Sequence, residues 1–239
     1  GVFLKVKEIL NRNSVKFSFV PVYELAYSDV KGSDLVITVG GDGTFICASH
    51  FIKGELILGI NSDFKTSEGG LLNLNKKNIY KLEKIFVGKF SIFNRRRIDV
   101  FLNGKKFKKK ALNEVYFGAR NQFHTSRYEL ILGEKLEEQR SSGVLVVSCT
   151  GSRAWYKSAG GRPFFRRGVL KYLVREPFVS RVFKSKLLRG RVESEISFVS
   201  KMYNDAVVSL DSNEIYEVGF DDVVRMKISE ERLKCVKFK

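Results

Sequence analysis

The sequence predicts an α/β domain followed by a mostly β domain, and two patterns of apolar residues support this division. Apolar runs at residues 35–39 and 56–60 alternate with segments of helical spacing, as in a parallel sheet with crossover helices. From residue 90 the apolar period changes to two, which is typical of strands. We therefore expect an α/β domain over residues 1–89 and a β-rich domain over residues 90–239, with the active site in the cleft between them. Whether the last strands return to the first domain stays open.

The elements of the first domain follow from local apolar patterns. Continuous runs of aliphatic residues predict buried strands, alternation predicts a strand with one exposed face, and spacings of three and four predict helices. Gly88 follows the last of these helical patterns, and glycine is common just after a helix because it adopts the left-handed backbone conformation easily. The expected helices cover residues 2–12, 45–52 and 76–87, and the expected strands cover residues 16–22, 35–39 and 56–61.

The second half of the chain is predicted to be a succession of short strands. Asn103 and Gly104 stand between two such runs, and this pair is a strong signal for a two-residue hairpin turn. The expected strands cover residues 92–93, 98–102, 111–117, 128–132, 143–148, 169–174, 192–199, 206–210, 214–218, 223–228 and 233–238.

The stretch at residues 35–44 is the strongest functional signal in the first half. A buried strand runs into Gly40, Gly41, Asp42 and Gly43, and a helical pattern follows Thr44. Three glycines within four positions allow a phosphate to approach the backbone closely and let amide groups point at it. The turn between a strand's carboxyl end and a helix's amino end is a favoured place for anions.

Asp42 is the unusual member of this stretch, because a carboxylate beside a phosphate cradle repels the ligand unless it handles a proton or a metal. The arrangement suggests a kinase in which Asp42 takes the proton from an attacking hydroxyl, while Mg²⁺ and backbone amides hold the transferred phosphoryl group. The simpler alternative is a tight turn with Asp42 as the helix N-cap. The strand at residues 56–61 ends in the amide of Asn61, a further candidate at the same sheet edge.

Length and composition indicate a globular chain. With 239 residues, 44% of them hydrophobic and 13% aromatic, the chain can bury a sizeable core. No apolar run reaches the roughly 18–20 residues that span a bilayer, and no signal-peptide pattern is present, so we expect a soluble intracellular protein without a membrane partner. The three cysteines lie far apart with no Cys or His at metal-ligand spacing, which favours reduced thiols and no protein-bound metal site.

The net charge of +17 is the one extreme of the composition, with 43 Lys and Arg residues against 26 Asp and Glu residues. Such a charge favours anionic ligands, including nucleic acid, acidic membranes and dinucleotides. The basic runs at residues 95–97 and 105–110 fit nucleic-acid patches, and they fit lysine-protected strand edges equally well. The charge alone does not choose among these partners.

Three polar segments in the second half carry residues that a β domain does not need. Asn113 and Glu114 interrupt an apolar strand, and their amide and carboxylate would suit ribose hydroxyls. Hydroxyls, glycines and a large ring follow at residues 140–143 and 150–161, and they make a plausible pocket for a base and a ribose. Each segment also has a structural alternative, as an edge-strand pair, a turn or a core aromatic residue.

Taken together, these motifs resemble the NAD kinase family. The GGDGT stretch at residues 40–44, Asn113 with Glu114, and the Thr-Gly-Ser-x-Ala-aromatic stretch at residues 150–155 occur in the family's order, and the resemblance covers essentially the whole chain. Within the family the chain is most similar to the mitochondrial type of animals. The stretches that echo this branch are residues 59–63, 66–69, 141–143, 175–177 and 181–183.

The resemblance implies a Rossmann-like amino-terminal domain and a β-sandwich carboxy-terminal domain. It also implies transfer of the γ-phosphate of ATP, with Mg²⁺, to the adenosine-ribose 2′-hydroxyl of NAD, and a homodimer or homotetramer in which Arg140 reaches into a neighbouring subunit's site. By this resemblance Asp42 is the general base, and the triphosphate or nucleotide contacts are Gly40, Gly41, Gly43, Thr44 and Asn61. The implied NAD contacts are Asn113, Glu114, Arg140, Ser142, Thr150, Ser152, Arg153, Ala154, Trp155 and Ser158.

The chain departs from the family pattern in its expected dinucleotide pocket. Many bacterial members have Asp, Thr and Tyr where this chain has Ser142, Arg153 and Trp155, so the pocket is more cationic here. The carboxy-terminal hairpin has Asp211 and Ser212 where the family often has Asp-Gly. These differences bear on the choice between NAD and NADH and leave the transfer chemistry intact.

Two other functions fit parts of the sequence. A lipid kinase of the diacylglycerol or sphingosine type shares the GGDG loop and the two-domain plan, but the motifs at residues 113–114 and 150–155 argue against it. A non-catalytic nucleic-acid-binding protein would account for the +17 charge. It is the weaker alternative, because no basic strand interleaved with aromatic residues of the RNA-binding kind is present. The compartment is expected to be the cytoplasm, or the mitochondrial matrix in a eukaryote.

Overall fold

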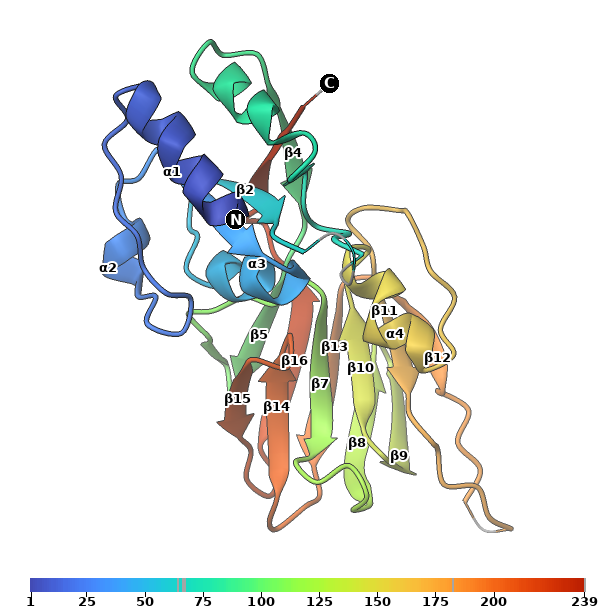
Figure 1. The fold of residues 1–239 in the computed structure, drawn as a ribbon. Helices are drawn as coiled ribbons and strands as arrows, with labels where there is room; N and C mark the ends of the chain where they lie inside the picture. Colours follow the sequence, from blue (N-terminus) through green and yellow to red (C-terminus); the bar gives the residue numbers. More distant parts are fainter. Residues whose placement is uncertain (64, 66–67, 182, 239) are drawn as a thin grey trace. The chain divides into compact units, whose positions relative to one another are not determined.

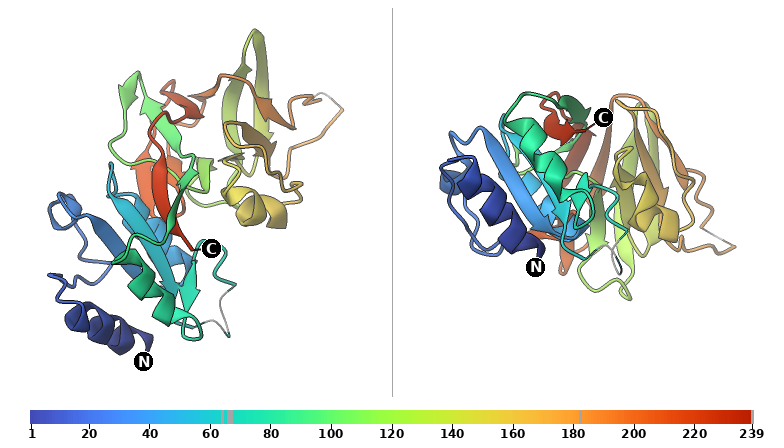
Figure 2. Two further views of the ribbon diagram at one scale, coloured as in Figure 1. Left: turned by 90° about the horizontal axis from the view of Figure 1, so that it is seen from above. Right: turned by 45° about the horizontal axis from the view of Figure 1, so that its top comes forward.

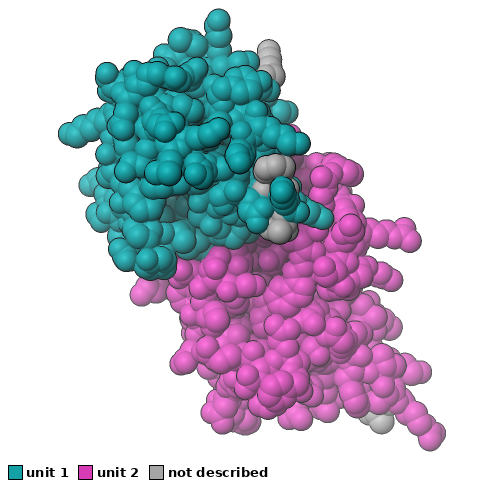
Figure 3. Space-filling view, in the orientation of Figure 1, with its two compact units in different colours: residues 1–95, 232–239 teal, residues 96–231 magenta. Residues whose placement is uncertain are grey.

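The computed structural model describes residues 1–63, 65, 68–181 and 183–238. Phe64, Thr66 and Ser67 of the expected polar loop, and Val182 of a stretch that echoes the animal branch, lie outside the described residues. The chain forms two compact units, Gly1–Arg95 with Arg232–Lys239 and Arg96–Glu231, which Figure 3 distinguishes by colour. The first unit therefore runs six residues past position 89 and contains the last strand of the chain.

The first unit is built on a mostly parallel sheet in which β2 and β17 occupy central positions. The sheet order is β1-β2-β17-β4, and β3 continues beside the carboxyl end of β2. Only β4 runs antiparallel to its neighbour. The strands are β1 (Leu35–Gly40), β2 (Leu56–Asn61), β3 (Leu74–Asn75), β4 (Ser91–Arg95) and β17 (Leu233–Lys237).

Helices cover both faces of this sheet (Figures 1 and 2). Leu58 and Ile60 of β2 lie in one apolar cluster with the first helix and the 3-10 helix, whereas Gly59 faces Phe45 of the helix after β1. This alternation explains why β2 is a continuous apolar run. The helices are α1 (Val2–Arg12), α2 (Tyr27–Val30), α3 (Asp42–Ser49) and the 3-10 helix η1 (Ile79–Ile85).

Two elements of the first unit differ from the prediction. Residues 16–22, all of them described, lie outside every strand: Phe17 and Phe19 are exposed, and the Phe19 ring packs on Phe3 of α1. Alternation of apolar and polar residues therefore did not predict a strand correctly here, although β1 is an edge strand of the sheet. The helix expected at residues 76–87 is the shorter η1, because its apolar residues recur every third position, which matches the three residues per turn of a 3-10 helix.

The second unit is a sandwich of two antiparallel six-stranded sheets. The first sheet has the order β12-β11-β10-β7-β14-β15, and the second has the order β6-β5-β16-β13-β8-β9. The strands of the first sheet are β7 (Glu114–Ala119), β10 (Val144–Val147), β11 (Leu170–Val174), β12 (Arg189–Val192), β14 (Ala206–Leu210) and β15 (Glu214–Glu217). Those of the second are β5 (Ile98–Leu102), β6 (Lys105–Lys106), β8 (Ser126–Leu132), β9 (Lys135–Ser141), β13 (Glu195–Ser200) and β16 (Val223–Ile228).

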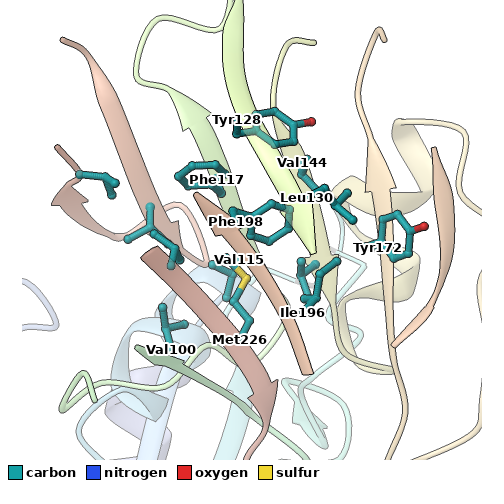
Figure 4. Close-up of a cluster of buried hydrophobic side chains, with 14 of the residues drawn as sticks. Val100, Val115, Phe117, Tyr128, Leu130, Val144, Tyr172, Ile196, Phe198 and Met226 are labelled. Carbon is teal, nitrogen blue, oxygen red and sulfur yellow. The ribbon is translucent and has the colours of Figure 1, made fainter. Parts of the chain in front are cut away.

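The core of the second unit lies between these sheets, and β7 is buried on both of its faces. Phe117 of β7 meets Tyr128 and Phe198 of the facing sheet (Figure 4). Tyr116 points to the other face, where it joins Tyr156 in a second apolar cluster. The two short helices on this outer face are the 3-10 helix η2 (Gly151–Arg153) and α4 (Trp155–Ser158). The fold is thus a layered α/β unit followed by a β-sandwich, as predicted.

The strand prediction for the second unit was right for most elements and missed one long strand. Asn103 and Gly104 both have positive φ, as a two-residue hairpin turn requires. The expected strand at residues 192–199 is two strands, β12 and β13. The seven-residue β9 was not expected, because its residues are mostly charged and it lies at a sheet edge with β8 as its one partner.

Candidate active site

The glycine-rich loop lies at the carboxyl edge of the parallel sheet in the first unit. Gly40 ends β1 and is paired in register with Asn61 at the end of β2, so the two carboxyl ends are adjacent. A Cβ on Gly40 would lie 2.3 Å from the Thr44 hydroxyl oxygen, so this glycine permits a close approach of the helix to the strand. Gly41 is the N-cap of α3, and Asp42 is its first residue. The structure therefore brings Gly40, Gly41, Asp42, Gly43, Thr44 and Asn61 to one edge, as the sequence pattern indicates.

Asp42 is not a conventional N-cap, because its carboxylate bonds to a different loop. The amide of Gly70 donates to Oδ2 at 2.9 Å, and the amide of Leu71 donates to Oδ1 at 2.9 Å. No Lys or Arg is recorded in an ion pair with Asp42 among the described residues. Each carboxylate oxygen has about two lone-pair sites, so one amide per oxygen leaves Asp42 able to accept a further proton donor.

Asn61 organises the start of the loop after β2. Its Oδ1 accepts the amide of Asp63 at 3.0 Å, and the Asn61 side chain is buried. Gly69 has a φ of +61°, and a Cβ there would lie 2.6 Å from the Asn61 amide nitrogen. The loop therefore depends on glycine at position 69 in order to lie against Asn61 and to present its next residues to Asp42.

In the second unit, Asn113 and Glu114 are buried at the start of β7 and carry polar atoms that lack protein partners. Asn113 is 7% exposed and Glu114 is 6% exposed. Asn113 Oδ1 and Glu114 Oε2 are both buried without a hydrogen-bond partner. Burial raises the pKa of the Glu114 carboxyl to about 8, and the nearby Asp211 charge adds to the effect. Buried polar atoms normally have partners, so these two oxygens are candidates for contact with a polar ligand.

Ser148 connects this pair to the Thr-Gly-Ser stretch. Its hydroxyl donates to the Leu112 carbonyl at 2.6 Å and accepts the amides of Thr150 and Gly151 at 3.1 and 3.3 Å. A Cβ on Gly151 would lie 2.2 Å from the Asn113 carbonyl oxygen, so the two segments touch backbone to backbone. Both segments carry a signal in the sequence, whereas Ser148 carries none, because a single serine after an apolar run is not distinctive.

The hydroxyl of Ser152 is fully committed to the protein. Its single proton lies within range of the Cys149 carbonyl at 2.9 Å and the Phe164 carbonyl at 3.1 Å, and its oxygen accepts the Phe164 amide. Ser152 is fully buried, so its role in the structure is to hold the turn of η2 against residue 164. Its neighbours Arg153, Ala154 and Ser158 are exposed or half-buried around α4, and the Arg153 guanidinium lies 4.8 Å from the Phe165 ring centre.

Trp155 lies between an aromatic ring and a cation on the outer face of β7. Its ring stacks on Tyr116 with 5.6 Å between centroids, and the Arg175 guanidinium lies 5.1 Å from the Trp155 ring centre. Tyr116 and Glu114 are two residues apart on the same strand, so Trp155 and the Glu114 carboxyl share one face of the sheet. Ser142 belongs to this group through its backbone. Its carbonyl accepts a hydrogen bond from the Tyr116 hydroxyl, and its amide donates to the backbone carbonyl of Arg175.

Arg140 lies apart from this group on β9 of the other sheet. Its guanidinium lies 4.2 Å from the Phe183 ring centre and 3.8 Å from the Glu138 carboxylate. The predicted residues of the second unit therefore fall into two connected groups on one sheet, around Ser148 and around Trp155, with Arg140 outside them. Asp211, named only as a departure in the hairpin, accepts three backbone amides beside Asn113 and belongs with the first group.

Side chains that could bind a metal do not form a cluster among the described residues. Nowhere in the described part of the sequence do three or more His, Cys, Asp or Glu side chains gather as a protein metal centre would require. Cys235 is buried, and Cys47 and Cys149 are half-buried. None of the helices among the described residues has the length and apolar character that crossing a membrane demands.

The fold is that of a known class of dinucleotide phosphotransferases. A crystal structure of an NAD kinase from Archaeoglobus fulgidus in complex with ATP superposes with a TM-score of 0.79 over 100% of this chain and 90% of that chain, at 23% identity. The yeast NADH kinase complexed with NADH matches with a TM-score of 0.74 over 90% of this chain and 65% of that chain, at 18% identity.

Sequence comparison defines the family. Residues 112–238 match the ATP-NAD kinase C-terminal domain, and an NAD kinase of Methanosarcina barkeri is 32% identical over 83% of this chain and 71% of its own length. The chain belongs to the NAD kinase family. These matches support neither the lipid-kinase nor the nucleic-acid alternative.

Proposed function

We propose that this chain transfers the γ-phosphate of ATP to the 2′-hydroxyl of the adenosine ribose of NAD, giving NADP and ADP. The proposal rests on two features, one in each unit, of a member of the NAD kinase family. One feature is a glycine-rich loop with a single carboxylate at a helix start. The other is a buried Asn and Glu pair with unpartnered oxygens. Both substrates are anionic, in keeping with the net charge of +17.

Asp42 is proposed as the general base. Its carboxylate takes the proton of the ribose 2′-hydroxyl as that oxygen bonds to the γ-phosphorus, and the bond from phosphorus to the β-phosphate oxygen breaks to release ADP. The two amide bonds from Gly70 and Leu71 hold the carboxylate in one orientation. A fixed base needs no reorganisation when the hydroxyl arrives.

The loop of the first unit is proposed to bind the phosphates of ATP. Gly40, Gly41, Gly43 and Thr44 lie at the amino end of α3, where unpaired amides and the helix dipole favour anions. Gly43 is exposed, and no protein atom lies within 4 Å of the place where its Cβ would be. That open space fits the close approach of a phosphate to the backbone. The Asn61 amide, at the end of the neighbouring strand, is proposed as a further nucleotide contact.

The polar groups of the second unit are proposed to bind NAD. Asn113 Oδ1 and Glu114 Oε2 supply acceptors, and with a pKa near 8 the Glu114 carboxyl also carries a proton at neutral pH and can donate it to a ribose oxygen. The remaining proposed contacts are Arg140, Ser142, Thr150, Ser152, Arg153, Ala154, Trp155 and Ser158. For Ser152 the contact would have to come from its backbone, since its hydroxyl is already used.

Mg²⁺ is proposed to enter with ATP. Mg²⁺ usually keeps several waters and binds substrate phosphates, so it can arrive on ATP without a cluster of protein ligands, and none is found among the described residues. The ion would neutralise the charge of the transferring phosphoryl group.

A homodimer or homotetramer is proposed for the assembly. Phe178 and Val179 are exposed apolar residues beside Arg140, whose carbonyl accepts the Phe178 amide, and exposed apolar residues commonly mark subunit contacts. Light scattering coupled to size exclusion would measure the number of subunits.

The chain is further proposed to lie on the animal mitochondrial branch and to work in the cytoplasm or the mitochondrial matrix. Residues 59–63 and 175–177 support the branch, and three cysteines far apart in the sequence fit a reducing compartment.

Product analysis by mass spectrometry tests the proposed function. The protein is incubated with Mg-ATP and with NAD, NADH or neither, and in a further arm with vesicles that contain diacylglycerol or sphingosine. We expect NADP or NADPH at the expense of ATP and no phosphorylated lipid. A phosphorylated lipid without NADP would replace the proposal by the lipid-kinase alternative, and the absence of any phosphorylated product would remove the kinase function.

A further inference from the structure

Asp211 occupies an unusual position beside the Asn113 and Glu114 pair. Its carboxylate accepts three consecutive backbone amides: Oδ2 accepts Leu112 at 2.7 Å, and Oδ1 accepts Asn113 at 2.7 Å and Glu114 at 3.0 Å. Asp211 is 6% exposed, so these bonds form in a poorly hydrated environment. Hydrogen bonds to a charged acceptor are stronger than neutral ones, and three of them on one segment fix its backbone closely.

The hairpin between β14 and β15 fixes the place of this carboxylate. Asp211 and Ser212 have φ values of +52° and +58°, and the Asn213 amide donates to the Leu210 carbonyl at 3.0 Å, as in a tight hairpin turn. The Asp211 amide also donates to the Glu114 carbonyl at 2.9 Å. The ladder between β14 and β7 pairs Leu210 with Val115. The carboxylate is therefore held by backbone on both sides and cannot move independently of β7.

The segment that Asp211 holds is the one whose side chains lack partners. Asn113 Oδ1 and Glu114 Oε2 are buried and unpartnered, although the backbone amides of the same two residues are fully used by Asp211. The fixed backbone sets the directions in which these two side chains leave the strand. The negative charge of Asp211 also helps to keep the Glu114 carboxyl protonated.

We propose that Asp211 is a positioning residue for the dinucleotide: its carboxylate fixes the backbone of residues 112–114 so that Asn113 and Glu114 present their oxygens to the ribose. This inference rests on the proposed function, since it takes NAD as the ligand of that pair. Asp211 does not itself touch the substrate in this account. The hairpin turn would thereby contribute to the NAD site although no residue of the turn was expected to bind NAD.

A graded pair of substitutions separates positioning from folding. Asp211→Asn keeps one acceptor oxygen and tolerates positive φ, but its amide nitrogen would meet one of the three backbone donors. Asp211→Gly also tolerates positive φ and removes all three bonds. We expect the KM for NAD to rise about tenfold in Asp211→Asn and about a hundredfold in Asp211→Gly, with the KM for ATP within twofold of wild type.

Asp205→Asn is the matched control. Asp205 directly precedes β14, whereas Asp211 directly follows it. Asp205 has a φ of +67°, and its carboxylate bonds to the Asn121 amide and to Nδ1 of His124. The same change of charge and shape therefore occurs at the opposite end of the same strand, and both KM values should stay within twofold of wild type. Hydrogen exchange of the amides of residues 112–114, followed by mass spectrometry, should accelerate in both Asp211 variants and not in the control.

The outcomes separate this inference from the proposed function. If wild type phosphorylates NAD and Asp211→Asn retains its KM for NAD, the positioning role is wrong. A rise of both KM values together, or a loss of kcat alone, would indicate a merely structural role and would also overturn it. If Asp211→Gly fails to fold, Asp211→Asn and the exchange measurement decide. A wild type that does not phosphorylate NAD would instead refute the function itself.

Discussion

At the scale of single residues, substitution of Asp42 gives the most direct test of the proposed chemistry. Replacing it with Asn keeps the shape but removes the proton acceptor and places an amide nitrogen against one of the donors at Gly70 and Leu71. We expect Asp42→Asn to lower the rate of NAD phosphorylation by about 10²–10⁴, the usual contribution of a general base. NAD binding, measured by calorimetry, should stay within a few-fold.

The control for Asp42 is Asp29→Asn. Asp29 also accepts a backbone amide near a helix start in the first unit, from Ala26 at 2.8 Å. This variant should lose at most about 0.5–2 kcal/mol of stability, as capping residues do, with unchanged phosphorylation. Full activity of Asp42→Asn would remove Asp42 from the role of base.

Glu114 makes the stability of the chain depend on pH in a direction opposite to that of an ordinary carboxylate. Its folded pKa is about 8, because burial and then the Asp211 charge disfavour the ionised form, whereas the ordinary value is 4.5. Between these values the folded chain keeps the proton and the unfolded chain releases it. The contribution of Glu114 to the free energy of unfolding is therefore fully present below pH 4.5 and is lost as pH rises to about 8.

Glu114→Gln should remove this pH dependence, because the amide does not titrate. Urea unfolding at pH 5 and pH 8 should show wild type losing on the order of a few kcal/mol more than the variant over this interval. Glu217→Gln, an exposed carboxylate on β15, should behave like wild type. An equal change in the free energy of unfolding between pH 5 and pH 8 for wild type and Glu114→Gln would show that Glu114 is ionised in the folded chain.

At the scale of structural elements, replacing two glycines by Ala should have different effects: one variant should lose stability and the other should lose activity. The three atoms nearest to a Cβ on Gly151 are backbone atoms of Asn113, the closest at 2.2 Å, so Gly151→Ala must separate two segments and should cost about 1–3 kcal/mol of stability. A Cβ on Gly43 meets no protein atom within 4 Å. Gly43→Ala should therefore fold with equal or slightly greater stability and still lose more than tenfold in phosphorylation. Unreduced activity in Gly43→Ala would show that no phosphate approaches this position.

The same scale shows what the sequence pattern could and could not predict. Gly40 to Thr44 gave a strong signal, because only a strand, a glycine turn and a helix satisfy that pattern together. The role of Asp211 was hidden, since its three partners are backbone amides 97–99 positions away and no side-chain pattern records them. The strand β9 was missed because its composition is charged. Residues 16–22 were overpredicted because alternation is a local signal, whereas a strand also needs hydrogen bonds to a neighbouring strand.

At the scale of the whole molecule, the charge of the chain and its topology answer different questions. The net charge of +17 bears on encounter with anionic nucleotides and does not determine the fold. The topology depends on the chain end: β17 lies between β2 and β4 in the first unit, although the intervening residues form the second unit. The first unit is therefore incomplete until the last residues of the chain have been added.

Truncation after Glu231 tests this dependence. It removes β17, whose Leu233, Cys235 and Val236 are at most 2% exposed, and it leaves β2 and β4 without their shared partner. Burial of each such side chain contributes about 1.5–3 kcal/mol, so the total approaches the whole stability of a typical domain. We expect hydrogen exchange to show loss of protection across residues 1–95 and retained protection in the strands of the second unit.

The control is the full-length chain with Lys234→Ala and Lys237→Ala, two exposed positions of the same strand, which should leave both units protected. Retained protection of β1 and β2 after truncation would mean that the first unit completes its sheet without β17.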